Sequence, residues 1–249
     1  MSEKLSILSH LNELKAVLLK AITSVLLVFL ILVYFAGDIY EFVSAPLIET
    51  LPSGTSMIAT QVVSPFFTPL KLTLYVSVFL AVPYLLFVMW RFVALGLYQH
   101  EKKAVLPLVM SSSVLFYGGV SFAFFVVLPI AFSFFSSVAL EGVNIATDID
   151  SYLSFVLKIF LAFGLAFQMP VATVLVCLTG ISSHQDLRKK RAHIIVGAFV
   201  IGMMLTPPDM FSQTLLAIPI WLLFEAGLLV ARFYEPNCNH IDSTLYTER

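Results

Sequence analysis

Charged side chains are scarce in this sequence. Of its 249 residues only 12% are Asp, Glu, Lys or Arg, whereas 59% are apolar and 23 are phenylalanine. A water-soluble domain of this size needs far more polar side chains to cover its surface. The composition therefore excludes a soluble protein and predicts an integral membrane protein.

Cysteine and catalytic motifs are equally sparse. Cys177 lies in an apolar run and Cys238 in a polar tail, so the sequence indicates neither a disulfide framework nor a paired metal site. No HExxH, P-loop or GxGxxG pattern is present, and we predict no active site, no metal and no cofactor. The five histidines lie singly on different segments, which does not favour a metal site: His10, His100, His184, His193 and His240.

Long apolar runs are abundant. About 20 apolar residues in a helix cross a bilayer core of about 30 Å, and backbone polar groups in lipid must be satisfied inside the helix. The predicted fold is an all-α polytopic membrane protein, with one transmembrane domain over 1–232 and a polar tail over 233–249. Its six predicted spans are about 17–36, 72–94, 104–138, 152–178, 194–205 and 211–230.

Proline predicts where these helices bend. Pro129 lies inside the charge-free segment 104–138 and should kink it, and Pro170 should leave the carbonyl of Ala166 without its helical donor. The segment 194–205 reaches only about 18 Å. The last two segments are therefore predicted to be short, either as two spans in a thinned bilayer or as a re-entrant hairpin. Both alternatives place the two termini in one compartment.

The basic residues predict which compartment that is. All 14 Lys and Arg residues except Lys71 and Lys158 lie in or beside the N-terminal tail, the second and fourth loops, or the C-terminal tail. The opposite loops, 37–70, 137–151 and 206–210, hold acids but no Lys or Arg. Cytoplasmic loops carry an excess of Lys and Arg, so we expect both termini to be cytoplasmic. Lys71 and Lys158 should snorkel outward.

The first outer loop is too apolar for a solvated linker. Ile39, Phe42, Val43 and Leu47 recur at helical spacing. This pattern predicts a short amphipathic helix across the outer ends of the spans. We expect the loop to form an ordered periplasmic cap.

Four polar side chains stand out, three of them near the predicted membrane boundary and Gln168 in the middle of the fourth span. Glu13 and Glu101 each precede a span, where a carboxylate either offsets a helix dipole or accepts a guanidinium in a bidentate pair. Gln168 either satisfies a freed backbone acceptor or faces a polar cavity between spans. Glu225 should snorkel or pair, because an isolated carboxylate facing lipid is costly.

Two other protein classes remain open at this point. A proton- or ion-coupled transporter could use Glu225, Gln168 and Lys158 as intramembrane polar sites, although no internal repeat is visible. An intramembrane enzyme is disfavoured, since the sequence offers no nucleophile and base pair.

Six stretches of the sequence together resemble one family. They are HLNELK, SAPL, SPFFTPLKL, LYQHEKK, GISSHQDLRKKR and MLTPPDMFSQTLLAIPIWLLFE. From about Leu8 to Arg232 the chain resembles the TatC family, the receptor subunit of the twin-arginine protein translocase. The resemblance implies a multi-pass protein of the bacterial cytoplasmic (inner) membrane that binds twin-arginine signal peptides at its cytoplasmic face. It also implies self-association, the single-span partners TatA and TatB, and export of folded proteins by the proton-motive force.

The same resemblance assigns the signal-peptide site. Glu13 and Glu101 match the family's acidic site, with Lys15 and Phe92 beside it. Gln168 is expected to line the groove for the apolar part of the peptide. The family often has Glu in place of Gln168, so a proton-carrying role is not implied here. At position 15 the family more often has Arg. Lys15 keeps the positive charge but lacks the planar bidentate donor of an arginine.

The resemblance also assigns the partner site. Met203, Thr206 and Gln213 match the polar site where the single helices of partner subunits dock, although Thr206 and Gln213 could simply cap the turn between the last two segments. Pro46 and Asp209 match family positions in the outer cap and the outer turn.

Overall fold

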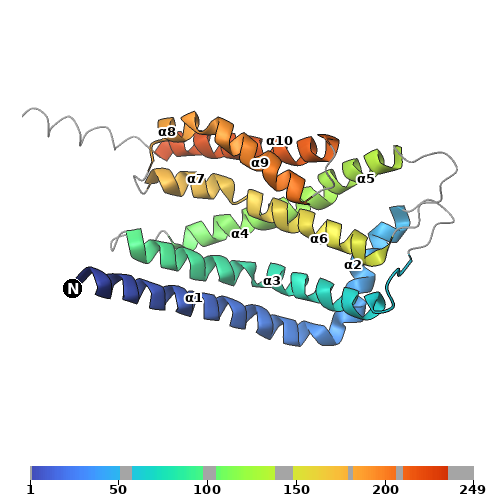
Figure 1. Cartoon of the computed structure of the whole chain (residues 1–249). Helices are drawn as coiled ribbons and strands as arrows, with labels where there is room; N and C mark the ends of the chain where they lie inside the picture. The colour runs from blue at the N-terminus through green and yellow to red at the C-terminus, as the bar shows by residue number, and fades with distance from the viewer. Residues whose placement is uncertain are drawn as a thin grey trace, which may run out of the picture. The chain divides into compact units, whose positions relative to one another are not determined.

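The computed structural model describes residues 2–50, 58–97, 105–137, 148–178, 182–205 and 210–234. These residues are almost entirely helical, which confirms the all-α prediction over these ranges (Figure 1). Within them the β-structure is an isolated parallel bridge between Ile58 and Asp148. The chain divides into two compact units, which are taken in turn: Met1–Ser113 with Phe134–Lys158, and Val114–Ser133 with Ile159–Arg249.

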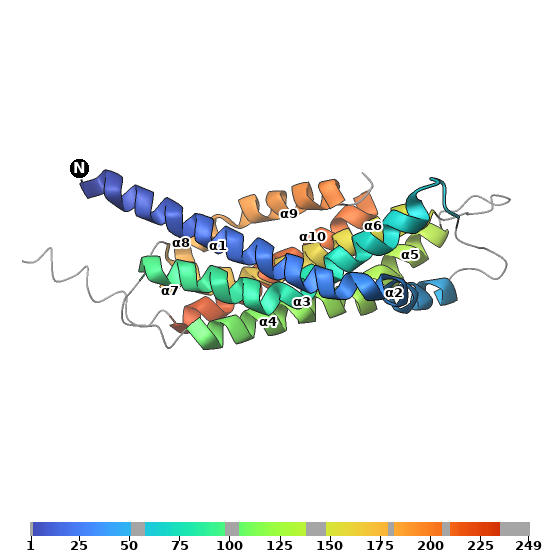
Figure 2. The same ribbon diagram turned by 90° about the horizontal axis from the view of Figure 1, so that it is seen from below.

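Two antiparallel helices form the framework of unit 1. They are α1 (Ser2–Leu32) and α3 (Ser64–Leu97), which pack along each other (Figure 1). A 3-10 turn, η1 (Val33–Phe35), ends α1 and leads into α2 (Ala36–Thr50). Helix α2 runs across the direction of α1 and packs against α3 (Figures 1 and 2). The helix predicted in this loop is thus confirmed.

Helix α3 begins at Ser64, well before the predicted start at residue 72. Pro65 occupies the first helical turn, where a missing N–H costs little. Two fully buried hydroxyls follow, and each bonds to its own helix: Thr73 Oγ1 donates to the carbonyl of Pro69 at 2.8 Å and Ser77 Oγ to that of Thr73 at 2.7 Å. Small hydroxyls satisfied in this way let a neighbouring helix approach closely.

Helix α1 is the least covered part of unit 1. It begins at Ser2 instead of residue 17, because its early polar residues are compatible with a helix. Within the apolar stretch from Asn12 to Ser44, none of the residues of the most apolar part is buried inside the protein. The outward side chains are large and apolar, as lipid-facing positions require; they include Leu18, Leu19, Ile22, Leu26, Leu27, Leu30 and Ile31.

The third apolar segment is interrupted where Pro129 predicts it. Helix α4 (Val105–Phe122) passes into a π-helical turn, η3 (Ala123–Val127), and continues as α5 (Leu128–Ser137). Pro129 has no N–H for the carbonyl one turn earlier, and the π turn lies directly before it in the chain. The sequence predicts a kink at Pro129, and the structure has an irregular turn at this point.

The fourth apolar segment is broken at Gln168. Helix α6 (Ile149–Ala166) ends before a turn at Phe167 and Gln168, and α7 (Met169–Leu178) follows. The N–H of Gln168 donates to the carbonyl of Leu165 at 3.0 Å, and the carbonyl of Gln168 accepts from the N–H of Ala172 at 2.9 Å. From Pro170 the sequence predicts a freed acceptor at Ala166, but it did not predict this break in the helix.

Unit 2 is completed by three further helices. They are α8 (His184–Lys189), α9 (Arg191–Leu205) and α10 (Met210–Tyr234). Helix α10 packs against both α7 and α9 (Figure 1). Gly227 makes the contact with α7 possible, because a Cβ atom there would lie 2.8 Å from Cα of Pro170.

The last two segments differ in length. Helix α9 has 15 residues and reaches about 22 Å, whereas α10 has 25 residues and reaches about 38 Å. Helix α10 continues past the predicted end at Val230 to Tyr234, but its apolar stretch, Gln213–Arg232, has 20 residues, the length predicted for the last span. In the described ranges, five helical stretches are long and apolar enough to cross a membrane, and α9 is a shorter apolar helix.

Candidate functional site

Three of the four predicted signal-peptide residues lie at one end of unit 1. Glu13 and Lys15 are exposed on α1, and Phe92 is half-buried near the end of α3. Because α1 and α3 are antiparallel, the start of one helix and the end of the other share this end (Figure 1). Glu101 lies outside the described residues.

The position of Glu13 within α1 excludes one of its two predicted roles. The helix begins at Ser2, so Glu13 lies three turns inside it. The favourable effect of an acid on a helix dipole falls off within the first turn. Glu13 therefore does not act by offsetting the dipole of this helix.

Gln168 occupies the break between α6 and α7. Its side chain is half-buried, with Oε1 shielded from solvent. The neighbouring ring of Phe167 packs against Phe122, with ring centroids 5.7 Å apart. Gly119 allows this contact, because a Cβ atom there would lie 2.9 Å from the Phe167 ring and 2.6 Å from the carbonyl of Phe163. Aromatic packing thus fixes the turn that carries Gln168.

The predicted partner-docking residues lie on the hairpin of α9 and α10. Met203 is exposed on α9. Gln213 is half-buried on α10, and its Nε2 donates to the carbonyl of Phe199 at 2.9 Å. Thr206 and Asp209 lie outside the described residues, as does the side chain of Pro46, which belongs to α2.

A polar cluster that the sequence did not predict joins α3 to the start of α6. It consists of Thr60, Thr68, Lys71, Asp148, Asp150, Ser151 and Ser154, and we name it the aspartate cluster. Lys71 Nζ donates to Asp150 Oδ1 at 3.3 Å and to Ser154 Oγ at 2.5 Å. Lys71 therefore pairs with an acid of the predicted outer loop 137–151, and its outward snorkelling stays a prediction.

Asp148 is the most fully satisfied acid of this cluster. One carboxylate oxygen accepts from the N–H and the hydroxyl of Thr60, at 3.1 and 2.8 Å. The other accepts from the N–H and the hydroxyl of Ser151, at 3.0 and 2.8 Å. The Thr60 N–H, followed by the Ser151 hydroxyl, holds the pKa of Asp148 well below its ordinary value.

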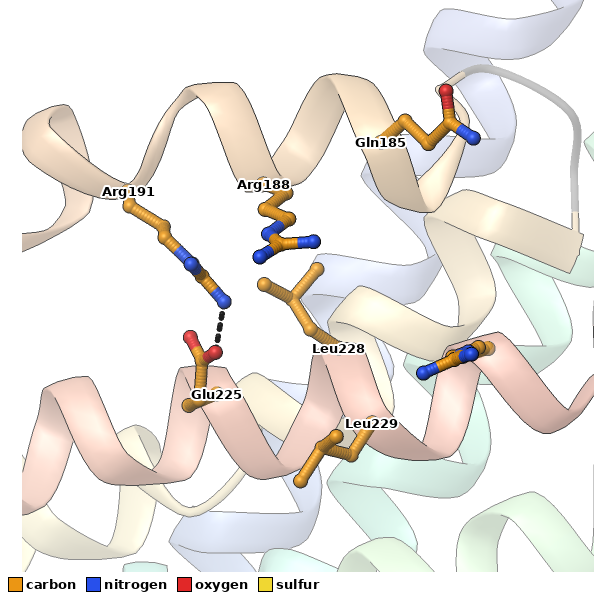
Figure 3. Close-up of a pocket in the computed structure, with 7 residues that line it drawn as sticks. Gln185, Arg188, Arg191, Glu225, Leu228 and Leu229 are labelled. Atoms are coloured by element: carbon orange, nitrogen blue, oxygen red, sulfur yellow. Dashed lines mark hydrogen bonds and ion pairs between the residues drawn. The ribbon is translucent and has the colours of Figure 1, made fainter.

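A second unpredicted feature is a pocket in unit 2, which we name the arginine pocket. It has a volume of about 500 Å³ and lies between α8, the start of α9 and the end of α10 (Figure 3). Arg191 donates to Glu225 across it in an ion pair. The prediction that Glu225 pairs is confirmed. The pocket is lined by Gln185, Arg188, Arg191, Glu225, Leu228, Leu229 and Arg232.

The helices around the pocket follow from local sequence. Ser183 caps α8 by accepting the N–H of Asp186 at 3.2 Å, which is a favoured N-cap arrangement. Lys190 ends α8 in a turn, and α9 starts again at Arg191. This turn aims Arg188 and Arg191 at α10 (Figure 3). In the sequence, the basic run DLRKKR indicates the positive charge of this pocket. The pairing of Arg191 with Glu225 could not be predicted, because it depends on how α10 packs.

The described residues contain no group of three or more His, Cys, Asp or Glu side chains suited to a metal ion. Their five long apolar helical stretches define the protein as a multi-pass membrane protein. A family model described as Sec-independent protein translocase protein (TatC) matches residues 9–219. The chain belongs to the TatC family, and it is a component of a protein translocase rather than an enzyme.

Relatives cover nearly the whole chain. The Sec-independent protein translocase protein TatC of Haemophilus influenzae is 58% identical over 94% of this chain and 91% of its own length. TatC of Escherichia coli K12 is 58% identical over 92% and 88%. A crystal structure of the twin-arginine translocase receptor TatC is 36% identical, covers 90% of this chain and 98% of its own, and superposes with a TM-score of 0.82.

Proposed function

We propose that this chain is the receptor subunit of a twin-arginine translocase in the bacterial inner membrane. In this role it binds twin-arginine signal peptides at its cytoplasmic face and, with TatA and TatB, exports folded proteins using the proton-motive force. Membership of the TatC family supports the proposal, as does the likeness to a solved twin-arginine translocase receptor. The transporter alternative loses support, because its proposed Glu225 is engaged by Arg191.

The observation that carries the peptide site is the exposed carboxylate of Glu13 in mid-helix. A carboxylate at a boundary between water and lipid attracts a guanidinium more strongly than one in bulk water. It can also accept two parallel N–H bonds from an arginine, which a lysine cannot supply. Glu13 and Glu101 would take the two arginines, with Phe92 from α3 as an apolar wall and Lys15 beside the site.

The apolar region of the signal peptide would continue along Gln168. The turn between α6 and α7 carries this amide within the apolar stretch Ile149–Cys177, which supports a depth where lipid offers no hydrogen-bond partner. An amide there can bond to the backbone of an incoming peptide without titrating. The family resemblance also assigns Pro46 of α2 to an outer cap and Asp209 to an outer turn.

Partner helices would dock on α9 and α10. Met203 has an exposed apolar side chain. Gln213 already uses Nε2 as the donor of a hydrogen bond to the carbonyl of Phe199. In the described part no hydrogen bond to Gln213 Oε1 occurs, so this atom can accept a donor from a partner helix. Together with Thr206, it would supply hydrogen bonds worth about 0.6–2 kcal/mol each in a membrane.

The topology proposed for this function has six spans with both termini in the cytoplasm. The short α9 would be the fifth crossing, in a locally thinned bilayer. The one-sided distribution of Lys and Arg supports this orientation.

The function is tested by capture of a signal peptide. Membranes containing the chain are exposed to a peptide with two consecutive arginines and a photo-crosslinker. Glu13→Lys and Glu101→Lys should each reduce the crosslinked fraction by about tenfold or more, because one charge-assisted pair becomes a repulsion. Glu41→Lys is the matched control, since Glu41 is an exposed acid on α2. Capture at the wild-type level by Glu101→Lys would contradict the proposal.

A further inference from the structure

The arginine pocket lies at the end of an apolar span. Helix α10 is apolar from Gln213 to Arg232, and Arg232 lines the pocket. Basic residues at the end of a span lie at the depth of lipid headgroups. The pocket therefore opens where a membrane phosphate is available.

The pocket has an excess of positive charge. Its described lining holds three guanidinium groups and one carboxylate. Arg191 is neutralised by Glu225. Arg188 and Arg232 are exposed, and no ion pair to either occurs among the described residues. Two positive charges are thus available to an anion.

The ion pair in the pocket is itself incompletely satisfied. Nε of Arg191 and Oε2 of Glu225 are both buried and lack a hydrogen-bond partner in the described structure. Buried polar atoms are nearly always paired, with protein, water or a ligand. An anion in the pocket would give the Arg191 N–H an acceptor.

The remaining wall of the pocket is apolar. Leu228 is buried, and Leu229 is more than half exposed next to the arginines. A small hydrophilic anion gains nothing from such a wall. An amphiphile places its phosphate on the guanidinium groups and the start of its acyl chain on Leu229, so that both surfaces are satisfied.

We propose that the arginine pocket binds the phosphate group of an anionic lipid, with Arg188 and Arg232 as its ligands. Each guanidinium can donate two parallel N–H bonds to phosphate oxygens. Pockets of this kind between transmembrane helices bind anionic headgroups. The shared chemistry is the phosphate anion, which could also be free in solution. The site is independent of signal-peptide binding, because its charge repels a basic peptide.

Native mass spectrometry of the purified full chain with phosphatidylglycerol tests this site. The double variant Arg188→Gln/Arg232→Gln should bind the lipid about 30-fold more weakly than the wild type. The matched control is Lys189→Gln/Lys190→Gln, which removes the same charge from exposed neighbours that do not line the pocket. The control should bind like the wild type.

Two further arms make the result decisive. Glu225→Gln removes the carboxylate from the described lining and leaves an acceptor for Arg191, so binding should tighten severalfold. Inorganic phosphate at the same concentration should not displace phosphatidylglycerol, because it makes no contact with Leu229. If inorganic phosphate displaces the lipid, the proposal that the bound phosphate belongs to a lipid is wrong, and the pocket is a site for free phosphate. Equal weakening in both double variants, or in neither, would overturn the site.

Discussion

The aspartate cluster and the arginine pocket hold charge at the end of an apolar helix in different ways. In the aspartate cluster, both oxygens of Asp148 accept two hydrogen bonds each, all within 3.1 Å. In the arginine pocket, buried atoms of Arg191 and Glu225 lack partners beside a cavity of about 500 Å³. A saturated network stabilises a structure, whereas an unsaturated one has capacity for a ligand.

The largest effect is expected at the ion pair of the arginine pocket. Glu225→Leu leaves Arg191 without its partner in a position where both side chains are about one-third exposed. Removing one partner of a fully buried pair costs about 3–5 kcal/mol. With this exposure we expect about 2 kcal/mol, measured as a lower midpoint of thermal unfolding in detergent. Glu225→Gln should lose less than half as much, and equal losses would show that the charge does not matter.

A smaller effect is expected at the ion pair of the aspartate cluster. Lys71→Met removes the bonds to Asp150 and Ser154, but both charged side chains are more than one-third exposed and can turn to water. We expect a loss of about 1 kcal/mol in unfolding free energy. Lys158→Met is the control, because Lys158 is exposed and forms no ion pair in the described part. If Lys71→Met lowers the free energy of unfolding more than Glu225→Leu does, the predicted order of the two ion pairs is wrong.

The smallest effect concerns the pH dependence of the same cluster. The pKa of Asp148 is lowered by Thr60 and Ser151, so its stabilising contribution is present above the ordinary pKa of an aspartate. That contribution is lost as the pH falls through the lowered value. The Thr60 amide should therefore remain protected from hydrogen exchange at pH 5, since Asp148 is still ionised. Asp148→Asn should speed hydrogen exchange of the Thr60 amide severalfold. If the exchange rate does not change, the Thr60 amide does not bond to Asp148.

Sequence patterns predicted the irregular points of the helices better than their ends. The π turn lies just before Pro129 and the break between α6 and α7 lies just before Pro170. A proline lacks the N–H that would bond to the carbonyl one turn earlier, so the irregularity falls close to the proline. The starts of α1 and α3 were missed, because hydrophobicity marks the edge of the bilayer and a helix can continue beyond it. The end of α10 was missed for the same reason at Arg232.

The candidate sites divide in a similar way. Glu13, Lys15 and Phe92 could be named from motifs, since each motif is a short continuous stretch. The partner of Glu225 could not be named, because Arg191 reaches it only through the antiparallel packing of α9 on α10. The bonds between Thr60 and Asp148 likewise join residues 88 positions apart. Contacts across helices depend on packing register, which one sequence does not reveal.

The most direct measurement is a charge exchange between the receptor and its ligand. The chain carries Glu13→Lys and Glu101→Lys together, and the signal peptide carries two glutamates in place of its two arginines. We predict that this exchanged pair crosslinks at least about tenfold more than the same variant does with the arginine peptide. If the exchanged pair crosslinks no better, the two carboxylates do not bind the arginine pair.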